Sequence, residues 1–110
     1  MSDSNGYQVR VVDSEGECIV EVSGEIDLHA RAELVTAISQ ASTAGQRLAI
    51  DLSGTTFIDS TTLKALLDTW RARVSAGHEF VLRDPSPAVM RILSCTSLAD
   101  ALPVERTDHS

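Results

Sequence analysis

The sequence is poor in aromatic residues, cysteine and basic residues, and each shortage excludes something. Aromatic residues make up only 4% of the chain, so its core must be built mainly from Leu, Val, Ile and Ala. Two cysteines are too few for a disulfide framework, and their spacing is not that of metal ligands. The 16 acidic residues against 9 basic ones give a net charge of −7, which disfavours nucleic acid and anionic membranes as partners. A basic protein surface remains as the natural partner.

Motifs that mark several protein classes are also absent. The sequence has no run of the ~18 apolar residues that a membrane span needs, and no secretory signal at its start. We therefore expect a cytoplasmic protein that is not inserted in a membrane. There is no Gly-rich nucleotide-binding loop and no Gly-x-Ser-x-Gly elbow. The three histidines, His29, His78 and His109, are far apart in the sequence, so we expect neither a metal site nor a bound cofactor.

The length and composition are those of one ordinary globular domain. The chain has 110 residues, of which 43% are hydrophobic and 23% are charged. A domain of this size can bury a stable core without disulfides or metal ions. We expect a single domain over residues 1–110, with a core at about 7–104 and polar termini, which is a monomer when free.

The hydrophobic pattern predicts strands that alternate with helices. The strands are expected at residues 8–13, 18–23, 47–52 and 79–83 and within 98–104. The helices are expected at residues 28–44, from 59 to 76, and after Pro85. This order predicts an α/β fold with a small mixed, mainly parallel sheet that begins with an antiparallel hairpin.

The first two helices carry the most specific local predictions. Asp27 is expected to cap the first helix, and Gly45 follows its end. The loop before the second helix is expected at residues 53–56, with Phe57 and Ile58 buried. The stripe that the second helix is expected to bury consists of Leu63, Leu66, Leu67, Trp70 and Val74. Its mostly off-stripe residues are Lys64, Asp68, Arg71 and Arg73.

Four consecutive polar residues, 59–62, open the second helix. One interpretation is capping, because Ser, Thr and Asp accept hydrogen bonds from the free amides of a first turn. One capping residue is enough for that purpose, and the Glu or Gln of a capping box is absent. The other interpretation is phosphorylation, since a helix N-terminus tolerates an added phosphate. A phosphate on Ser60 would add negative charge beside Asp59 and near Asp27.

The chain resembles a STAS domain of the anti-sigma-factor antagonist family in three segments. Residues 22–27 (VSGEID) resemble the strand-to-helix Gly-Glu-Ile/Leu-Asp segment of that family. Residues 51–63 resemble its segment Asp-Leu…Phe-Ile-Asp-Ser-Ser/Thr-Gly-Leu, and residues 85–89 resemble the turn before its third helix. With the matching order of elements, the likeness covers almost all of residues 7–104.

The resemblance implies a fold, a function and a site. The helices would pack mostly on one side of the sheet. An anti-sigma factor that is also a serine kinase would bind the unphosphorylated chain, phosphorylate Ser60 and thereby release it, so that transcription is regulated indirectly. A metal-dependent serine phosphatase would reverse the mark, and ATP and magnesium would belong to the kinase. The implied partner-binding residues are Asp27, Asp59, Ser60, Thr61, Thr62 and Lys64.

One residue departs from the family pattern. Thr62 stands where the family usually has glycine, and it adds a side chain to the first helical turn, where a partner needs space. This departure puts the efficiency of phosphorylation at Ser60 in question. It also permits Thr61 as a second phosphate acceptor.

Two other classes of function stay open from the sequence. A non-switching scaffold, or a cytoplasmic subunit associated with a transporter, would use the same surface without a phosphate cycle. An enzyme would need a base near Ser60 and an oxyanion site, and the adjacent Asp59 alone is weak support. We therefore expect no enzymatic activity. A redox switch between Cys18 and Cys95 is disfavoured by a cytosolic setting.

Overall fold

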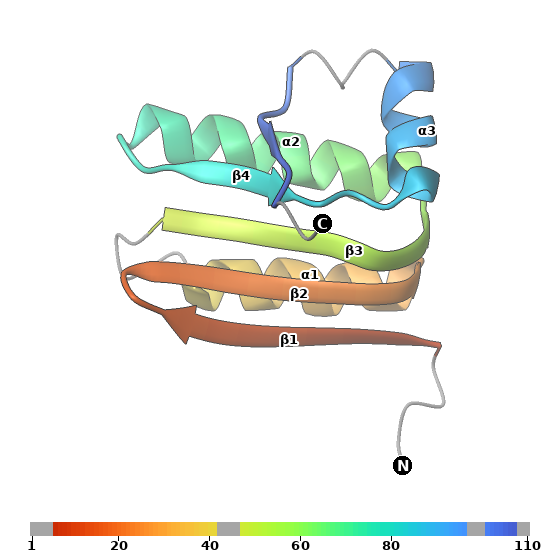
Figure 1. Ribbon diagram of the computed structural model, residues 1–110, viewed down its shortest axis with the longest axis horizontal. Helices are drawn as coiled ribbons and strands as arrows, with labels where there is room; N and C mark the ends of the chain where they lie inside the picture. The colour runs from red at the N-terminus through yellow and green to blue at the C-terminus, as the bar shows by residue number, and fades with distance from the viewer. Residues whose placement is uncertain (1–5, 42–46, 97–100, 108–110) are drawn as a thin grey trace.

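The structure is a computed structural model that describes residues 6–41, 47–96 and 101–107 (Figure 1). Its elements, in chain order, are β1 (Tyr7–Ser14), β2 (Glu17–Ile26), α1 (Leu28–Ala41), β3 (Arg47–Ile58), α2 (Ser60–Ser75), β4 (Phe80–Arg83), α3 (Pro87–Thr96) and β5 (Val104–Glu105). The predicted ends of some segments, at residues 42–44 and 98–100, lie outside the described residues, as do Gly45 and His109.

The five strands form one mixed sheet in the order β1-β2-β3-β4-β5. Strands β1 and β2 pair antiparallel, as expected for the hairpin, and the remaining neighbours pair parallel. Each parallel connection passes through a helix, as parallel neighbours require. The predicted α/β class and mainly parallel sheet are therefore confirmed.

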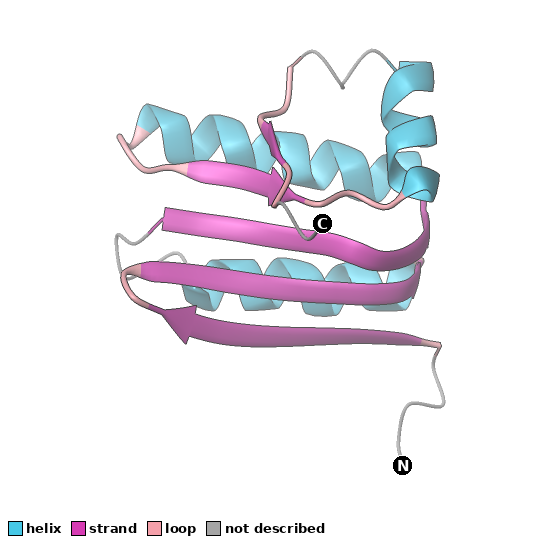
Figure 2. Ribbon diagram, in the orientation of Figure 1, coloured by secondary structure: helices cyan, strands magenta, loops and turns pink. Residues whose placement is uncertain are grey.

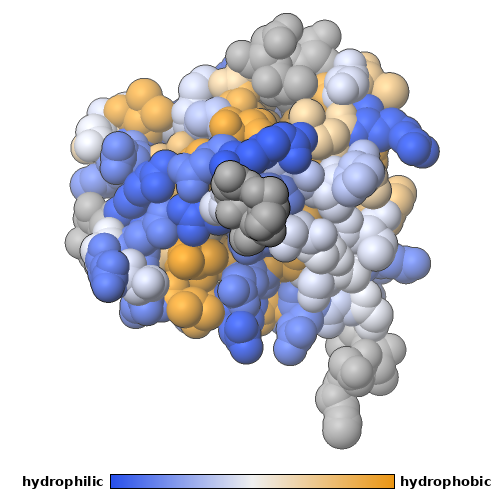
Figure 3. All heavy atoms as spheres, viewed as in Figure 1, coloured by the Kyte–Doolittle hydropathy of each residue, from blue (hydrophilic) through white to orange (hydrophobic). Residues whose placement is uncertain are grey.

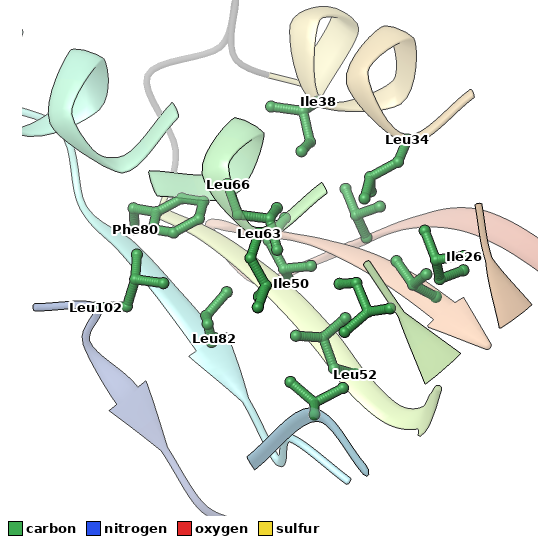
Figure 4. Close-up of a cluster of buried hydrophobic side chains, with 14 of the residues drawn as sticks. Ile26, Leu34, Ile38, Ile50, Leu52, Leu63, Leu66, Phe80, Leu82 and Leu102 are labelled. Carbon is green, nitrogen blue, oxygen red and sulfur yellow. The ribbon is translucent and has the colours of Figure 1, made fainter. Parts of the chain in front are cut away.

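The helices α1 and α2 both lie behind the sheet in Figure 1, and α3 stands at the carboxyl end of β3 (Figures 1 and 2). Every second residue of the central strands points toward α1 and α2, because successive side chains in a strand face opposite ways. Between these layers lies an aliphatic core (Figure 4), which includes Ile50, Leu82, Leu34, Leu63 and Leu66. Packing of the helices mostly on one side is as the resemblance implied.

The opposite face of the sheet is polar, with hydrophilic residues across much of its surface (Figure 3). Four side chains from four strands form an ion-pair network there. Arg47 donates to Glu17 at 3.0 Å and to Glu105 at 2.6 Å. Arg83 donates to the same two carboxylates. The network ties the short edge strand β5 to the centre of the sheet.

The loop predicted at residues 53–56 is wrong, because β3 continues through it to Ile58. The pairing with β2 shifts twice along this stretch, and β3 carries one extra residue at each shift. Glycine, which is typical of loops, is also common at β-bulges, so the bulged segment has the composition of a loop. Gly54 fits this position because a Cβ there would lie 2.9 Å from the Cβ of Ser23. Phe57 was predicted to be buried together with Ile58. Ile58 points into the core as predicted, but the prediction for Phe57 is wrong, because Phe57 is 48% exposed.

The second helix buries most of the predicted stripe, but not at its end. Leu63, Leu66 and Leu67 are buried, whereas Val74 is 54% exposed and Arg73 is only 4% exposed. The Arg73 guanidinium donates from Nε and Nη2 to the Glu79 carbonyl, at 3.1 and 2.9 Å. Its alkyl stem can therefore lie inside while its charge is hydrogen-bonded, which a pattern of apolar letters does not indicate.

Candidate functional site

The parallel pairing of β2 and β3 brings two helix starts together at one edge of the sheet. Ile26 and Ile58 are direct partners in the register. Asp27 and Asp59, which follow them, therefore leave the sheet side by side and begin α1 and α2 (Figure 1). This is the edge where open α/β sheets bind ligands and partners.

Asp27 caps α1, as predicted from the sequence. Its Oδ1 accepts hydrogen bonds from the amides of His29 at 3.1 Å and Ala30 at 3.4 Å. Residue Asp27 is exposed. The carboxylate thus satisfies amides of its own helix while remaining open to solvent or to a partner.

Asp59 caps α2 and contacts α1. Its Oδ1 accepts from the Thr62 amide at 2.8 Å, and its Oδ2 lies 3.5 Å from Nη1 of Arg31. Partial burial acts to raise the pKa of the Asp59 carboxyl. The Thr62 hydroxyl and amide and the positive charge of Arg31 lower this pKa by a larger amount. The net pKa lies below the ordinary value, so Asp59 is ionised at neutral pH.

Ser60 is the first residue of α2 and is exposed. Within the described part of the chain, no hydrogen bond or ion pair engages its side chain. Thr61 and Lys64 are exposed beside it on the same helix. Five of the six residues implied as partner-binding therefore gather at this edge with surface available, with Asp59 the least exposed of them.

Thr62 is the sixth of these residues and lies beneath the surface. Its side chain is completely buried, and its hydroxyl lies near Asp59 without the geometry of a full hydrogen bond. Thr62 therefore does not occupy space in front of Ser60, contrary to the expectation from its place in the motif. The third position of the helix faces inward, and the four-letter polar run does not reveal this.

Apolar side chains that the sequence analysis missed flank the same edge. Leu28 is 63% exposed directly after Asp27, and Phe57 is 48% exposed shortly before Ser60. A hollow of about 550 Å³ runs between α1 and α2, and its lining includes Leu28, Arg31, Thr61 and Lys64. A signal for Leu28 was present in the sequence, because a large apolar residue beside a cap and outside the buried stripe must face outward.

Outside this edge, the described residues include two free thiols but no metal-binding group. No group of three or more His, Cys, Asp or Glu residues in residues 6–41, 47–96 and 101–107 could hold a metal ion. Cys18 is a free thiol in the core, where burial raises its pKa, and Cys95 is a free, exposed thiol on α3. Among the described helices, none is long and apolar enough to cross a membrane.

Comparison with known proteins identifies the family of the chain. Residues 8–110 match the model of the STAS domain family. The Mycobacterium tuberculosis protein named anti-sigma-F factor antagonist RsfA is 28% identical over 110 residues, covering 97% of this chain and 86% of that protein.

Solved structures agree. An anti-sigma factor antagonist from Mycobacterium paratuberculosis is 30% identical and superimposes with a TM-score of 0.83, over 97% of this chain and 92% of the other. The antagonist SpoIIAA in its unphosphorylated form shares the fold at 22% identity, with a TM-score of 0.70 over 93% and 90% of the two chains. The chain therefore belongs to the STAS domain family, among the anti-sigma factor antagonists.

Proposed function

We propose that this protein binds a cognate anti-sigma factor through the edge around Ser60, and that phosphorylation of Ser60 by the same partner ends the complex. The observation that carries this proposal is the exposed Ser60 side chain, which stands at the first position of α2 without a hydrogen bond. The names of the M. tuberculosis and M. paratuberculosis relatives support the class of partner.

The contact surface has the composition of a protein interface. It contains the carboxylate of Asp27, the hydroxyls of Ser60 and Thr61, and the ammonium group of Lys64. Exposed Leu28 lines the same hollow as Thr61 and Lys64, and exposed Phe57 stands near the end of β3. Large apolar side chains bordered by polar ones mark protein contact sites, and the net charge of −7 favours a basic partner surface.

The switch needs no rearrangement of the fold. Because the Ser60 side chain supports no other residue, adding a phosphate breaks no contact of the folded chain. The phosphate would bring about −1.5 to −2 charges to a surface that already carries Asp27 and Asp59. At an effective dielectric of 20, one pair of unit charges 4 Å apart interacts by ~4 kcal/mol as an upper guide, and ~1.4 kcal/mol changes affinity tenfold.

In the proposed cycle this chain is the substrate and binding module, and the partners supply the chemistry. The kinase would transfer the terminal phosphoryl group of ATP to Oγ of Ser60, with loss of the hydroxyl proton and release of ADP. A serine phosphatase would return the hydroxyl by hydrolysis. Thr61, which is also exposed, is a second candidate acceptor. Burial of the Thr62 side chain leaves the approach to Ser60 open.

The first test is the mass of the intact protein purified from its native cell. We expect a fraction of molecules heavier by ~80 Da, the mass of one phosphoryl group. The adduct should be lost in Ser60→Ala and kept in Ser75→Ala, which changes an exposed serine at the other end of α2. An adduct that maps to neither Ser60 nor Thr61, or the absence of any adduct under every growth condition, contradicts the switch.

The second test is the affinity for the anti-sigma factor that copurifies with the tagged protein. Ser60→Glu should weaken binding at least tenfold, whereas Ser60→Ala and Ser75→Glu should bind as the wild type does. Copurification of a transporter subunit in place of a small ATP-binding kinase, with binding insensitive to Ser60→Glu, would favour the non-switching scaffold.

A further inference from the structure

Arg31 is the cation best placed to respond to a charge on Ser60. It lies in the first turn of α1, where its amide donates to the Asp27 carbonyl at 2.8 Å. Its side chain crosses to α2 and reaches Asp59, the residue immediately before Ser60. The side chain is only 21% exposed, so its stem is held between the helices and its guanidinium is confined to this edge.

The present partner of Arg31 holds it weakly. The contact with Asp59 is a single one at 3.5 Å, from Nη1 alone, whereas a strong guanidinium–carboxylate pair is bidentate and near 2.8 Å. The other oxygen of Asp59 already accepts the Thr62 amide at 2.8 Å. Among the described residues, no further hydrogen bond of the Arg31 guanidinium is present, so four of its five N–H donors are available.

Lys64 is the other positively charged residue that lines the hollow between α1 and α2. It differs from Arg31 in its exposure and in its ion-pair partner. Its side chain is 73% exposed, and it lies 3.6 Å from Asp68 one turn further along α2. A flexible, hydrated ammonium group of this kind acts as a point charge, whereas a guanidinium can bind two oxygens of one phosphate. Lys64 therefore provides a matched control for Arg31.

We propose that Arg31 is the intramolecular ligand of a phosphate on Ser60, and that its guanidinium passes from Asp59 to the phosphate when Ser60 is modified. This inference rests on the proposed phosphorylation of Ser60. A phosphoserine dianion attracts a guanidinium more strongly than a carboxylate monoanion does. The groups that face the phosphate are then the two caps, Asp27 and Asp59, which repel it, and Arg31 and Lys64, which attract it.

The consequence for regulation is a phosphorylated state that carries its own counter-ion. Arg31 would reduce the repulsion that Asp27 and Asp59 exert on the phosphate, and so stabilise the modified chain. The same movement would take Arg31 away from Asp59 and leave that carboxylate without this ion pair beside Ser60. One phosphorylation would thus change the charge of this surface at two places, at Ser60 and at the Arg31–Asp59 pair.

The test uses the full-length chain with phosphoserine placed at residue 60 by genetic encoding, which makes it independent of any kinase. Phosphorus NMR then follows the second ionisation of the phosphate as the pH changes. A nearby cation favours the dianion, so Arg31→Gln should raise the proton affinity of the phosphate about fivefold, the effect of a unit charge at 4 Å in water. Lys64→Gln, which removes the same formal charge, should raise it less than twofold.

Equal effects of the two variants would overturn the proposal, because they would mean a general charge effect in place of a ligand. If Arg31→Gln fails to fold, the nitrogen NMR signal of the Arg31 side chain in the wild type gives the answer. It should shift between the unmodified and the phosphoserine protein, and an unchanged signal overturns the proposal. Either of these negative results would overturn the role of Arg31 without contradicting the phosphorylation of Ser60. Absence of phosphate on the native protein would instead refute the proposed function, and the measurement on the phosphoserine protein would still report what Arg31 does.

Discussion

The Asp59 carboxylate has two roles that use its two oxygens separately. One oxygen holds the first turn of α2 through the Thr62 amide, and the other faces Arg31. The sequence allowed the prediction that Asp59 stands at the start of this helix, because polar caps follow from local rules. It gave no indication of Arg31, since that contact joins residues that are 28 positions apart.

Removal of the Asp59 cap should destabilise the fold in a pH-dependent way. Asp59→Ala should lower the free energy of unfolding by about 1 kcal/mol at pH 7, the usual cost of a lost cap. Because the folded pKa of Asp59 is below its ordinary value of 3.8, its stabilisation is present above that value and is lost as the pH falls through the folded pKa. Urea unfolding at pH 7 and near pH 3 measures both effects.

The control for this variant is Asp68→Ala, on the exposed face of the same helix. Its pair with Lys64 is solvent-exposed, so the loss of stability should be small. If the two variants cost the same, or if the cost of Asp59→Ala does not decrease in acid, the cap is not what stabilises this turn.

Strand β5 has only two residues and depends on side chains for part of its attachment. Glu105 accepts from Arg47 and from Arg83, and these two arginines also share Glu17. The edge position was predictable from Pro103, since proline cannot donate to a sheet ladder. The network was not predictable, because the four residues come from four strands whose register only the fold defines.

Neutralising Glu105 should weaken this attachment. The hydrogen bond from Arg47, and the charges of Arg47 and Arg83, lower the pKa of Glu105 below its ordinary value despite the opposing effect of burial. Glu105→Gln should cost about 0.5–1 kcal/mol at pH 7 and low salt, because the side chain is partly screened by solvent. The stabilisation is present above the ordinary carboxyl pKa and disappears as the pH falls through the folded pKa.

Glu79→Gln is the matched control, because Glu79 lies 3.9 Å from the same Arg47 but its side chain is 77% exposed. Thermal unfolding of both variants in low and high salt is the measurement. A cost for Glu105→Gln that is unaffected by acid and by salt would show that the ion pairs contribute nothing.

The whole molecule has two contrasting surfaces, which are the open face of the sheet and the edge around Ser60. The open sheet face carries a network of ion pairs, whereas the edge around Ser60 exposes the apolar side chains of Leu28 and Phe57 and the Ser60 hydroxyl. The opening hairpin, the mainly parallel sheet and the nearness of Asp27 to the start of the second helix could be predicted, because parallel strands end at the same edge. The exposure of Leu28 had a signal in the sequence. The exposure of Phe57 was missed because the loop predicted at residues 53–56 hid the place of Phe57 beside Ile58 in one continuous strand.

Leu28 should be an anchor of the partner complex. Leu28→Ser should weaken binding of the anti-sigma factor at least tenfold, because it removes a large apolar side chain from the proposed contact. It should leave the thermal unfolding temperature nearly unchanged, since the residue is already 63% exposed. Val74→Ser, at the other end of α2, is the control and should bind normally. Titration calorimetry with equal losses for both variants would contradict this assignment.

The two bulges also determine how far the phosphate acceptor protrudes. Strand β3 has 12 residues and its parallel partner β2 has 10, yet Ile58 and Ile26 finish level. Without the two surplus residues, or with a third, Ser60 would be displaced along the sheet by about 3.3 Å for each residue changed. A deletion or insertion well inside a strand could thus retract or extend the switch relative to Asp27, and alter which docking protein it can meet, while every amino acid at the contact stays the same.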